Sequence, residues 1–167
     1  MQTGELIVVR LNNRPGIGRY VDADSTRVRV AIGRNREARL PLARVLLQTG
    51  LKGSNHEAVE ALTRDAETVA SVLDLAELWD LVCDDGDSMT LSDIAELYWS
   101  DEPTAAQRVG LLFHLNRNDL QFTSKGDTYI PRTREEVAEL QARRDRTARH
   151  AAEATSLSES WASGNLP

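Results

Sequence analysis

The sequence has one cysteine, few aromatic residues and no long hydrophobic run. The lack of cysteines and the lack of a long hydrophobic run each exclude a class of protein. Cys83 is the single cysteine, so neither an internal disulfide nor a cysteine-based metal site is expected. No apolar run approaches the roughly 20 residues that cross a bilayer, and the N-terminus lacks signal-peptide features. These absences predict a cytoplasmic protein without membrane contact. Hydrophobic residues still make up 41% of the 167 residues, so a buried core is expected.

Familiar catalytic and nucleotide-binding patterns are also missing. The glycine fingerprint of dinucleotide sites, the phosphate loop and the serine-hydrolase elbow do not occur. The three histidines, His56, His114 and His150, lie in separate segments without the spacing of a metal site. The aspartates of residues 84–87 are most simply a solvated loop, because no ligand from another segment accompanies them. The chain itself is therefore predicted to be non-catalytic, with no metal or cofactor of its own.

The net charge of −6 conceals three unlike blocks. Residues 1–53 carry ten Lys and Arg against four acids, a net charge of +6. Residues 54–105 carry one Arg against fourteen acids, or −13, and residues 106–167 are nearly balanced at +1. A basic block attracts a polyanion because each neutralised phosphate releases counterions, whereas an acidic block is repelled by it. The first block is therefore the better candidate for binding nucleic acid.

Residues 1–53 have the pattern of a small antiparallel β-barrel. Glu5–Leu11 and Thr26–Ile32 are rich in β-branched residues, and the second run alternates Arg with Val, which places the arginines on one face. Runs rich in Gly, Asn, Asp or Pro at 12–16, 22–25 and 33–36 predict turns. Short strands separated by turns over about fifty residues are typical of SH3-like or cold-shock-like barrels.

The next segment has the order of a winged helix-turn-helix. Apolar residues at helical spacing over 58–81 predict one or two helices. Thr90 and Asp93 have the form of a capping box that opens a short helix to Trp99, and a third helix is expected from Ala105 to about Leu115. A hairpin follows, with strands at 120–123 and 128–131 around a Gly-Asp turn, and it would form the wing.

The predicted fold class is therefore α+β: a small N-terminal antiparallel β-barrel, then a winged helix-turn-helix and a C-terminal helix. The expected domain organisation has four parts. These are a basic barrel over 1–53, the winged helix-turn-helix over 54–133, a charged helix over 134–155 and a loose tail or linker over 156–167.

The basic residues of the barrel and the wing are the candidate binding residues. Arginine offers a planar fork that holds phosphate at two points, although a run of charges is often only a solvated surface. Tyr20 is the only aromatic residue in the first block, so contact with the phosphate backbone and little recognition of bases is expected. The candidates are Arg10, Arg14, Arg19, Arg27, Arg29, Arg34, Arg36, Arg39, Lys125 and Arg132.

The segment Lys125–Leu140, taken with the helix-turn-helix and the small barrel before it, resembles the N-terminal region of bacterial ribonuclease II family enzymes. The resemblance is to the branch of cyanobacteria and Deinococcus-like bacteria, in which a winged helix takes part of the place of cold-shock domains. It implies a parent exoribonuclease that degrades RNA from the 3′ end, with Mg held by aspartates of a large central domain. No position here matches those aspartates, so the resemblance implies a missing catalytic domain and an accessory region that guides single-stranded RNA.

Two other functions remain open. A winged-helix transcription regulator would read duplex DNA with its third helix, through residues such as Gln107, Arg108 and Arg117. The acidic block around that helix argues against this function. A protein-interaction module would instead dock the acidic block or the C-terminal helix on another domain or on a basic partner.

Overall fold

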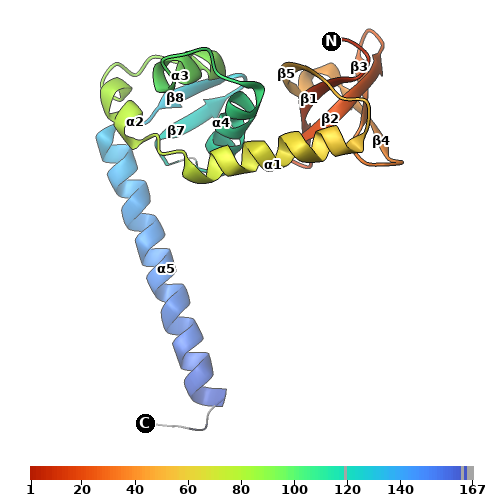
Figure 1. The fold of residues 1–167 in the computed structure, drawn as a ribbon. Helices are drawn as coiled ribbons and strands as arrows, with labels where there is room; N and C mark the ends of the chain where they lie inside the picture. The colour runs from red at the N-terminus through yellow and green to blue at the C-terminus, as the bar shows by residue number, and fades with distance from the viewer. Residues whose placement is uncertain (119, 163, 165–167) are drawn as a thin grey trace.

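The computed structural model describes residues 1–118, 120–162 and 164, and it has the expected α+β class (Figure 1). A five-stranded sheet is followed by a helical module with a three-stranded wing and by one long helix. The first part contains β1 Glu5–Leu11, β2 Arg14–Ala23, β3 Arg27–Ala31, β4 Glu37–Pro41, the 3-10 turn Leu42–Arg44 and β5 Val45–Lys52. The second contains α1 His56–Val72, α2 Ala76–Val82, β6 Met89–Thr90, α3 Leu91–Tyr98, α4 Ala105–Arg117, β7 Phe122–Lys125 and β8 Thr128–Pro131.

The N-terminal sheet is antiparallel with strand order β4-β3-β2-β1-β5. The sequence predicted a small barrel, but the sheet is not closed, because no ladder joins β4 to β5 among the described residues. Valines and isoleucines alternate along the strands, so Ile7, Val9, Val28 and Val30 form a buried cluster on one face of the sheet. The other face of β1 and β2 is covered by helices, so burial does not require a closed barrel.

Helix boundaries in the second part follow local capping chemistry. The predicted capping box is confirmed: Thr90 accepts from the amide of Asp93, and the Asp93 carboxylate accepts from the amide of Thr90. A second capping box, between Thr104 and Gln107, begins α4. Pro103 lies just before that cap. The wing hairpin turns at Gly126, whose φ of +66° suits glycine.

The sheet and the helical module share one hydrophobic core. Leu6, Val8 and Ile17 from the sheet pack with Val59 of α1 and Phe113 of α4. The α1–α4 crossing is close, because a Cβ at Gly110 would lie 2.7 Å from the Cβ of Val69. Residues 1–53 and 54–133 were expected as separate domains; in the structure each part has a buried cluster of its own, and the two also share this one.

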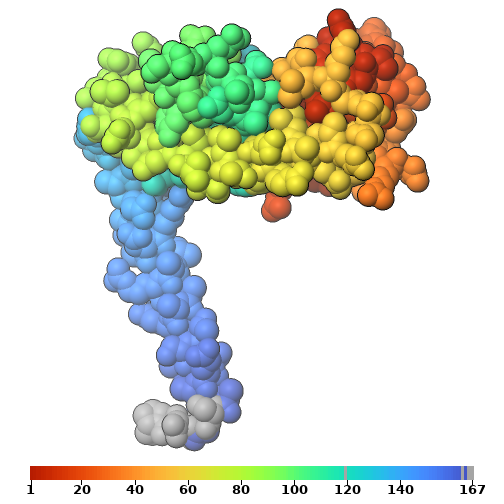
Figure 2. All heavy atoms as spheres, in the orientation of Figure 1, coloured from red at the N-terminus to blue at the C-terminus, as the bar shows by residue number. Residues whose placement is uncertain are grey.

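The last helix, α5 (Arg134–Ala162), leaves the body of the protein at its first turn and stands clear of it (Figure 2). It contains no buried residue. It extends beyond the predicted end at 155, so residues 156–162, expected in a loose tail, are helical. The rest of that tail, apart from Gly164, lies outside the described residues. No helix in the described ranges is long and apolar enough to cross a membrane.

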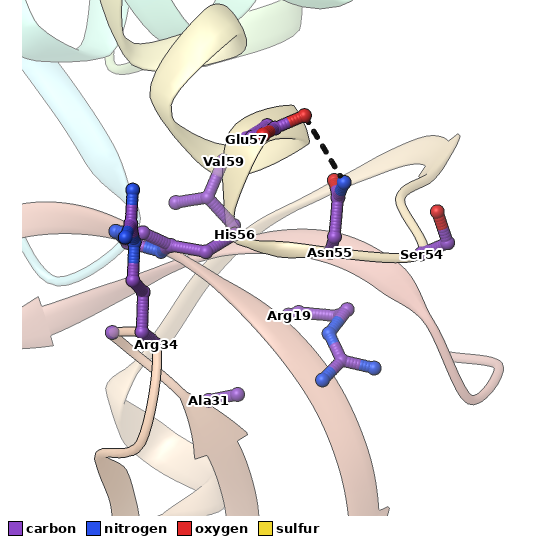
Figure 3. Close-up of a pocket in the computed structure, with 9 residues that line it drawn as sticks. Arg19, Ala31, Arg34, Ser54, Asn55, His56, Glu57 and Val59 are labelled. Atoms are coloured by element: carbon purple, nitrogen blue, oxygen red, sulfur yellow. Dashed lines mark hydrogen bonds between the residues drawn. The ribbon is translucent and has the colours of Figure 1, made fainter.

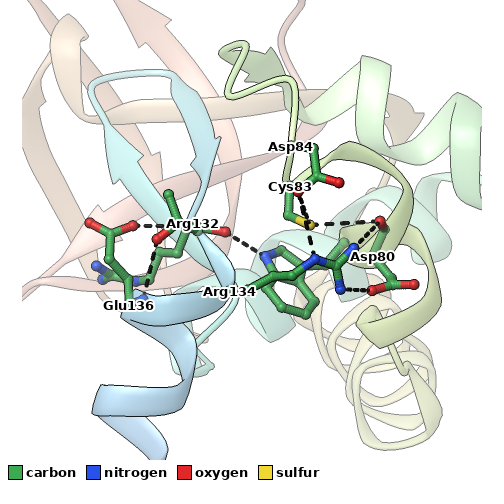
Figure 4. Close-up of polar contacts among 8 residues, drawn as sticks. Asp80, Cys83, Asp84, Arg132, Arg134 and Glu136 are labelled. Atoms are coloured by element: carbon green, nitrogen blue, oxygen red, sulfur yellow. Dashed lines mark hydrogen bonds and ion pairs between the residues drawn. The ribbon is translucent and has the colours of Figure 1, made fainter.

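The start of α5 is held by polar contacts with α2 (Figure 4). Arg134 forms an ion pair with Asp80, lies 3.6 Å from Asp84 through its Nε atom, and stacks over the ring of Trp79. The indole N–H of Trp79 donates to the carbonyl of Arg132 at 2.8 Å. These contacts set the direction in which α5 leaves the wing.

Candidate nucleic-acid interface

Most of the basic side chains of the sheet have no acidic partner. Eight of the ten candidate residues lie on the strands or turns of residues 1–53. Six of these eight form no ion pair with any residue that the structure describes, and all but the half-buried Arg19 are exposed. The six are Arg10, Arg14, Arg19, Arg27, Arg34 and Arg36. Their guanidinium groups are free to contact an anion.

The other two arginines of the sheet are already neutralised. Arg29 forms an ion pair with Asp22 and lies 3.8 Å from Glu37. Arg39 lies 2.5 Å from a carboxylate oxygen of Asp24. Such exposed pairs contribute little stability, but a polyanion would have to displace the carboxylates to bind these groups.

Asp24 organises the turn between β2 and β3. Its carboxylate accepts from the amides of Thr26 and Arg27, each at 2.8 Å, and from the side chain of Arg39. The Thr26 amide is the largest cause of the lowered pKa of Asp24, followed by Arg39 and the Arg27 amide. The carboxylate therefore stays charged and keeps Arg39 in place.

The unpaired arginines do not form the single surface that the sequence suggested. Arg19 and Arg27 lie on the face of the sheet opposite the valine cluster, since Arg19 pairs with Ala31 and residues alternate along β3. Arg19 and Arg34 also line an open pocket of about 420 Å³ with His56 from the start of α1 (Figure 3). Arg10 lies elsewhere, in a groove that borders the wing.

The two candidate residues outside the sheet differ in accessibility. Lys125 is exposed at the end of β7, next to the wing turn, and is available for contact. Arg132 is half-buried, and its backbone joins the wing to Trp79 and to Gln121 (Figure 4). The backbone of residue 132 therefore helps to fix the base of α5.

The third helix of the winged module is turned inward. Six of the seven residues from Val109 to Leu115 are buried, and Asn116 and Arg117 are the only exposed residues of α4. Arg108 donates to the Thr49 carbonyl of β5, and its Nε is buried without a partner. Arg117 forms a bidentate pair with Glu67 of α1, which lowers the pKa of that carboxyl. So few exposed positions on α4 argue against the transcription-regulator alternative, in which this helix would read a major groove.

The groups considered for catalysis or metal binding lie apart. Across the described ranges, no three His, Cys, Asp or Glu side chains come together as a possible metal site. His114 contacts the Ala70 carbonyl through Nδ1 at 3.2 Å. Burial raises the pKa of the Cys83 thiol, so the thiolate that would act as a nucleophile is disfavoured.

One group of polar residues was missed by the sequence reasoning. Asn116 at the end of α4 and Ser124, Asp127 and Tyr129 of the wing face Arg10 of β1 across a groove of about 330 Å³. Burial raises the pKa of Tyr129, and the nearby charge of Arg10 opposes that shift. No motif connects these positions, because the groove exists only where the sheet meets the wing.

The comparison with protein families agrees with this architecture. The model of the ribonuclease II winged helix domain matches residues 61–136, from the first turns of α1 through the wing to the start of α5. No curated protein and no solved structure gives a match. Residues 61–136 are thus a ribonuclease II family winged helix domain, and this match supports the assignment of the chain to the N-terminal region of a ribonuclease II family protein.

Proposed function

We propose that this chain is an RNA-binding accessory region, which guides single-stranded RNA into a ribonuclease II-type 3′-to-5′ exoribonuclease. The catalytic domain, and the Mg that it would hold, belong to a part of the enzyme that these residues do not contain. The observation that carries the proposal is the family match over the winged helix domain. The acidic helical module would repel RNA, so in the larger enzyme it would lie away from the RNA path.

The unpaired arginines of the sheet would supply the RNA contacts. Arg19, Arg27 and Arg34 are available on one side of the sheet, and Arg10 lies beside the wing that carries Lys125. Contacts of this kind neutralise phosphates and carry no sequence information. The region would therefore hold RNA of any sequence with a strength that depends on salt.

A fluorescence-anisotropy titration with a labelled single-stranded RNA tests the proposal. Binding should weaken steeply with salt, because each phosphate contact on a single strand contributes a slope of about −0.7 in log K against log salt. Duplex DNA of the same length should bind more weakly, because α4 is covered. Absence of RNA binding at low salt, or an affinity that does not change with salt concentration, would overturn the proposal.

Two sets of arginine variants separate the free from the neutralised groups. Replacing Arg27, Arg34 and Arg36 together by alanine should reduce RNA affinity and lower the salt slope by about 2, since up to three phosphate contacts are lost. Replacing Arg29 and Arg39 by alanine is the matched control, because both already face carboxylates. Equal losses in the two sets would show that the ion pairs do not decide which arginines bind.

A second function, docking of another protein, is favoured by one observation. Leu81 of α2 is 81% exposed and Leu97 of α3 is 60% exposed, and both line an apolar groove flanked by Asp74 and Glu77. Charge complementarity predicts a basic, partly apolar segment as the partner. Capture of one defined protein from nuclease-treated lysate, lost in a Leu81→Glu variant, would support it. Capture that disappears after nuclease treatment would point back to RNA.

A further inference from the structure

The groove between the sheet and the wing has the composition of a small-molecule site. Apolar side chains from both modules line it, among them Leu46 of β5 and Leu112 of α4. Its volume of about 330 Å³ is at the lower end of the range for ligand sites, about 300 to 1,000 Å³. A groove of this size can hold one planar ring system but no large ligand.

The polar side chains of the groove have no partner within the described part of the chain. Arg10, Asn116, Ser124, Asp127 and Tyr129 form no side-chain hydrogen bond or ion pair with another described residue. They come from β1, the end of α4 and the two wing strands with their turn. Five polar side chains from the sheet, α4 and the wing therefore line one groove without bonding to another described residue.

We infer that this groove receives a single unstacked nucleobase of the bound RNA. The inference rests on the proposed function and adds to it a contact with a base. The side chains suit the edge of a base better than a phosphate: Asn116 offers a donor and an acceptor, and Asp127 accepts only. A phosphate would require donors throughout and would be repelled by the Asp127 carboxylate. The ring of Tyr129 and the guanidinium of Arg10 are both groups on which a base can stack.

One neighbouring residue can hold the backbone of such a nucleotide. Lys125 follows the groove residue Ser124 at the end of β7, just before the wing turn. Its side chain is exposed and can neutralise a phosphate that flanks the inserted base. Arg14 pairs with Leu11 and so lies on the face of the sheet opposite to that of Arg10. The groove would thus anchor the RNA at one nucleotide while the other contacts remain independent of sequence.

The test compares two polyanions that differ only in their bases: a 12-nucleotide oligouridine and a 12-unit ribose-phosphate oligomer without bases. The full chain should bind the oligouridine about tenfold more tightly, because both the stacking of a base and the hydrogen bonds to its edge are lost in the other oligomer. Replacing Asn116 and Ser124 together by alanine should reduce this ratio to less than about threefold. The same chain with Asn35→Ala, an exposed asparagine in the β3–β4 turn, should keep it.

A Tyr129→Phe variant removes only the hydroxyl. This variant should lower the ratio of the two affinities by a smaller factor than the double variant does. Circular dichroism checks that every variant is folded. Equal affinity of the unmodified chain for the two oligomers, with binding retained, would overturn the base pocket and leave the proposed function standing. Failure of both oligomers to bind at low salt would instead overturn the proposed function.

Discussion

Individual charged residues of the sheet differ in what surrounds them, and this decides which of them are available to an anion. Arg27 and Arg29 lie two positions apart on the same face of β3. Arg29 faces Asp22 and Glu37, whereas Arg27 faces no carboxylate among the described residues. One arginine is therefore held by carboxylates of the neighbouring strands, and the other has no carboxylate partner among the described residues.

The pKa of Asp24 leads to a prediction about stability at the scale of one residue. Because its folded pKa is lowered, its contribution is full above the unfolded pKa of about 3.9 and is lost as the pH falls through the folded value. An Asp24→Ala variant should therefore unfold at lower urea concentration than the unmodified chain near neutral pH. This difference should shrink below about pH 4. Urea unfolding at a series of pH values measures it, and a difference that stays constant down to pH 2.5 would contradict the assignment.

At the scale of elements, α1 and α4 cross closely at Gly110. A Cβ added to Gly110 would lie 2.8 Å from the Ala66 carbonyl oxygen and 2.7 Å from the Val69 Cβ. Neither a backbone oxygen nor a β-branched side chain can move without shifting the helix. The helices can therefore approach to this distance only with glycine at position 110.

A Gly110→Ala substitution should consequently destabilise the protein by about 1–3 kcal/mol, because overpacking outweighs the better helix propensity of alanine. The free energy of unfolding in urea measures the effect. Gly33→Ala is the matched control, since the nearest atom to its Cβ would be 3.5 Å away. It should change stability by less than about 0.5 kcal/mol. Similar losses of unfolding free energy in the two variants would show that the helix crossing has room for a Cβ at position 110.

At the scale of the whole molecule, the contacts between the body and α5 in the described part of the chain lie in the first two turns of the helix. Val137 and Leu140 are half-buried, and from residue 141 to the described end every side chain except that of Ser160 is exposed. The large side chains Leu157 and Trp161 are 61% and 78% exposed. The helix thus contributes little to the stability of the body.

A chain that ends at Gln141 should therefore keep the stability of the full chain within about 0.5 kcal/mol. It still contains Arg134 and its contacts with Asp80, Asp84 and Trp79. Urea unfolding followed by tryptophan fluorescence compares the two chains, with Arg134→Ala as the variant that should destabilise. A loss of about 2 kcal/mol on truncation would mean that the distal part of α5 packs on the body.

Local chemistry in the sequence was sufficient to predict the elements. Alternating valines in β3, the Thr90–Asp93 capping box and the Gly-Asp turn of the wing all act within a few residues, so strand, helix and hairpin could be predicted from neighbours alone. The capping box between Thr104 and Gln107 carried the same kind of local signal and was overlooked. The length of α5 was underestimated because its serine-rich end has no apolar period, although residues up to Ala162 are helical.

The tertiary structure alone decided the openness of the sheet, the inward orientation of α4, the pairing of Arg29 and Arg39, and the groove beside Arg10. Each depends on residues far apart in the chain: Arg10 meets Tyr129, and Arg117 meets Glu67. The sequence by itself determined the unequal charge of the blocks and the kind of element each block forms. It could not determine which arginines remain free, because that depends on the carboxylates that folding brings beside them.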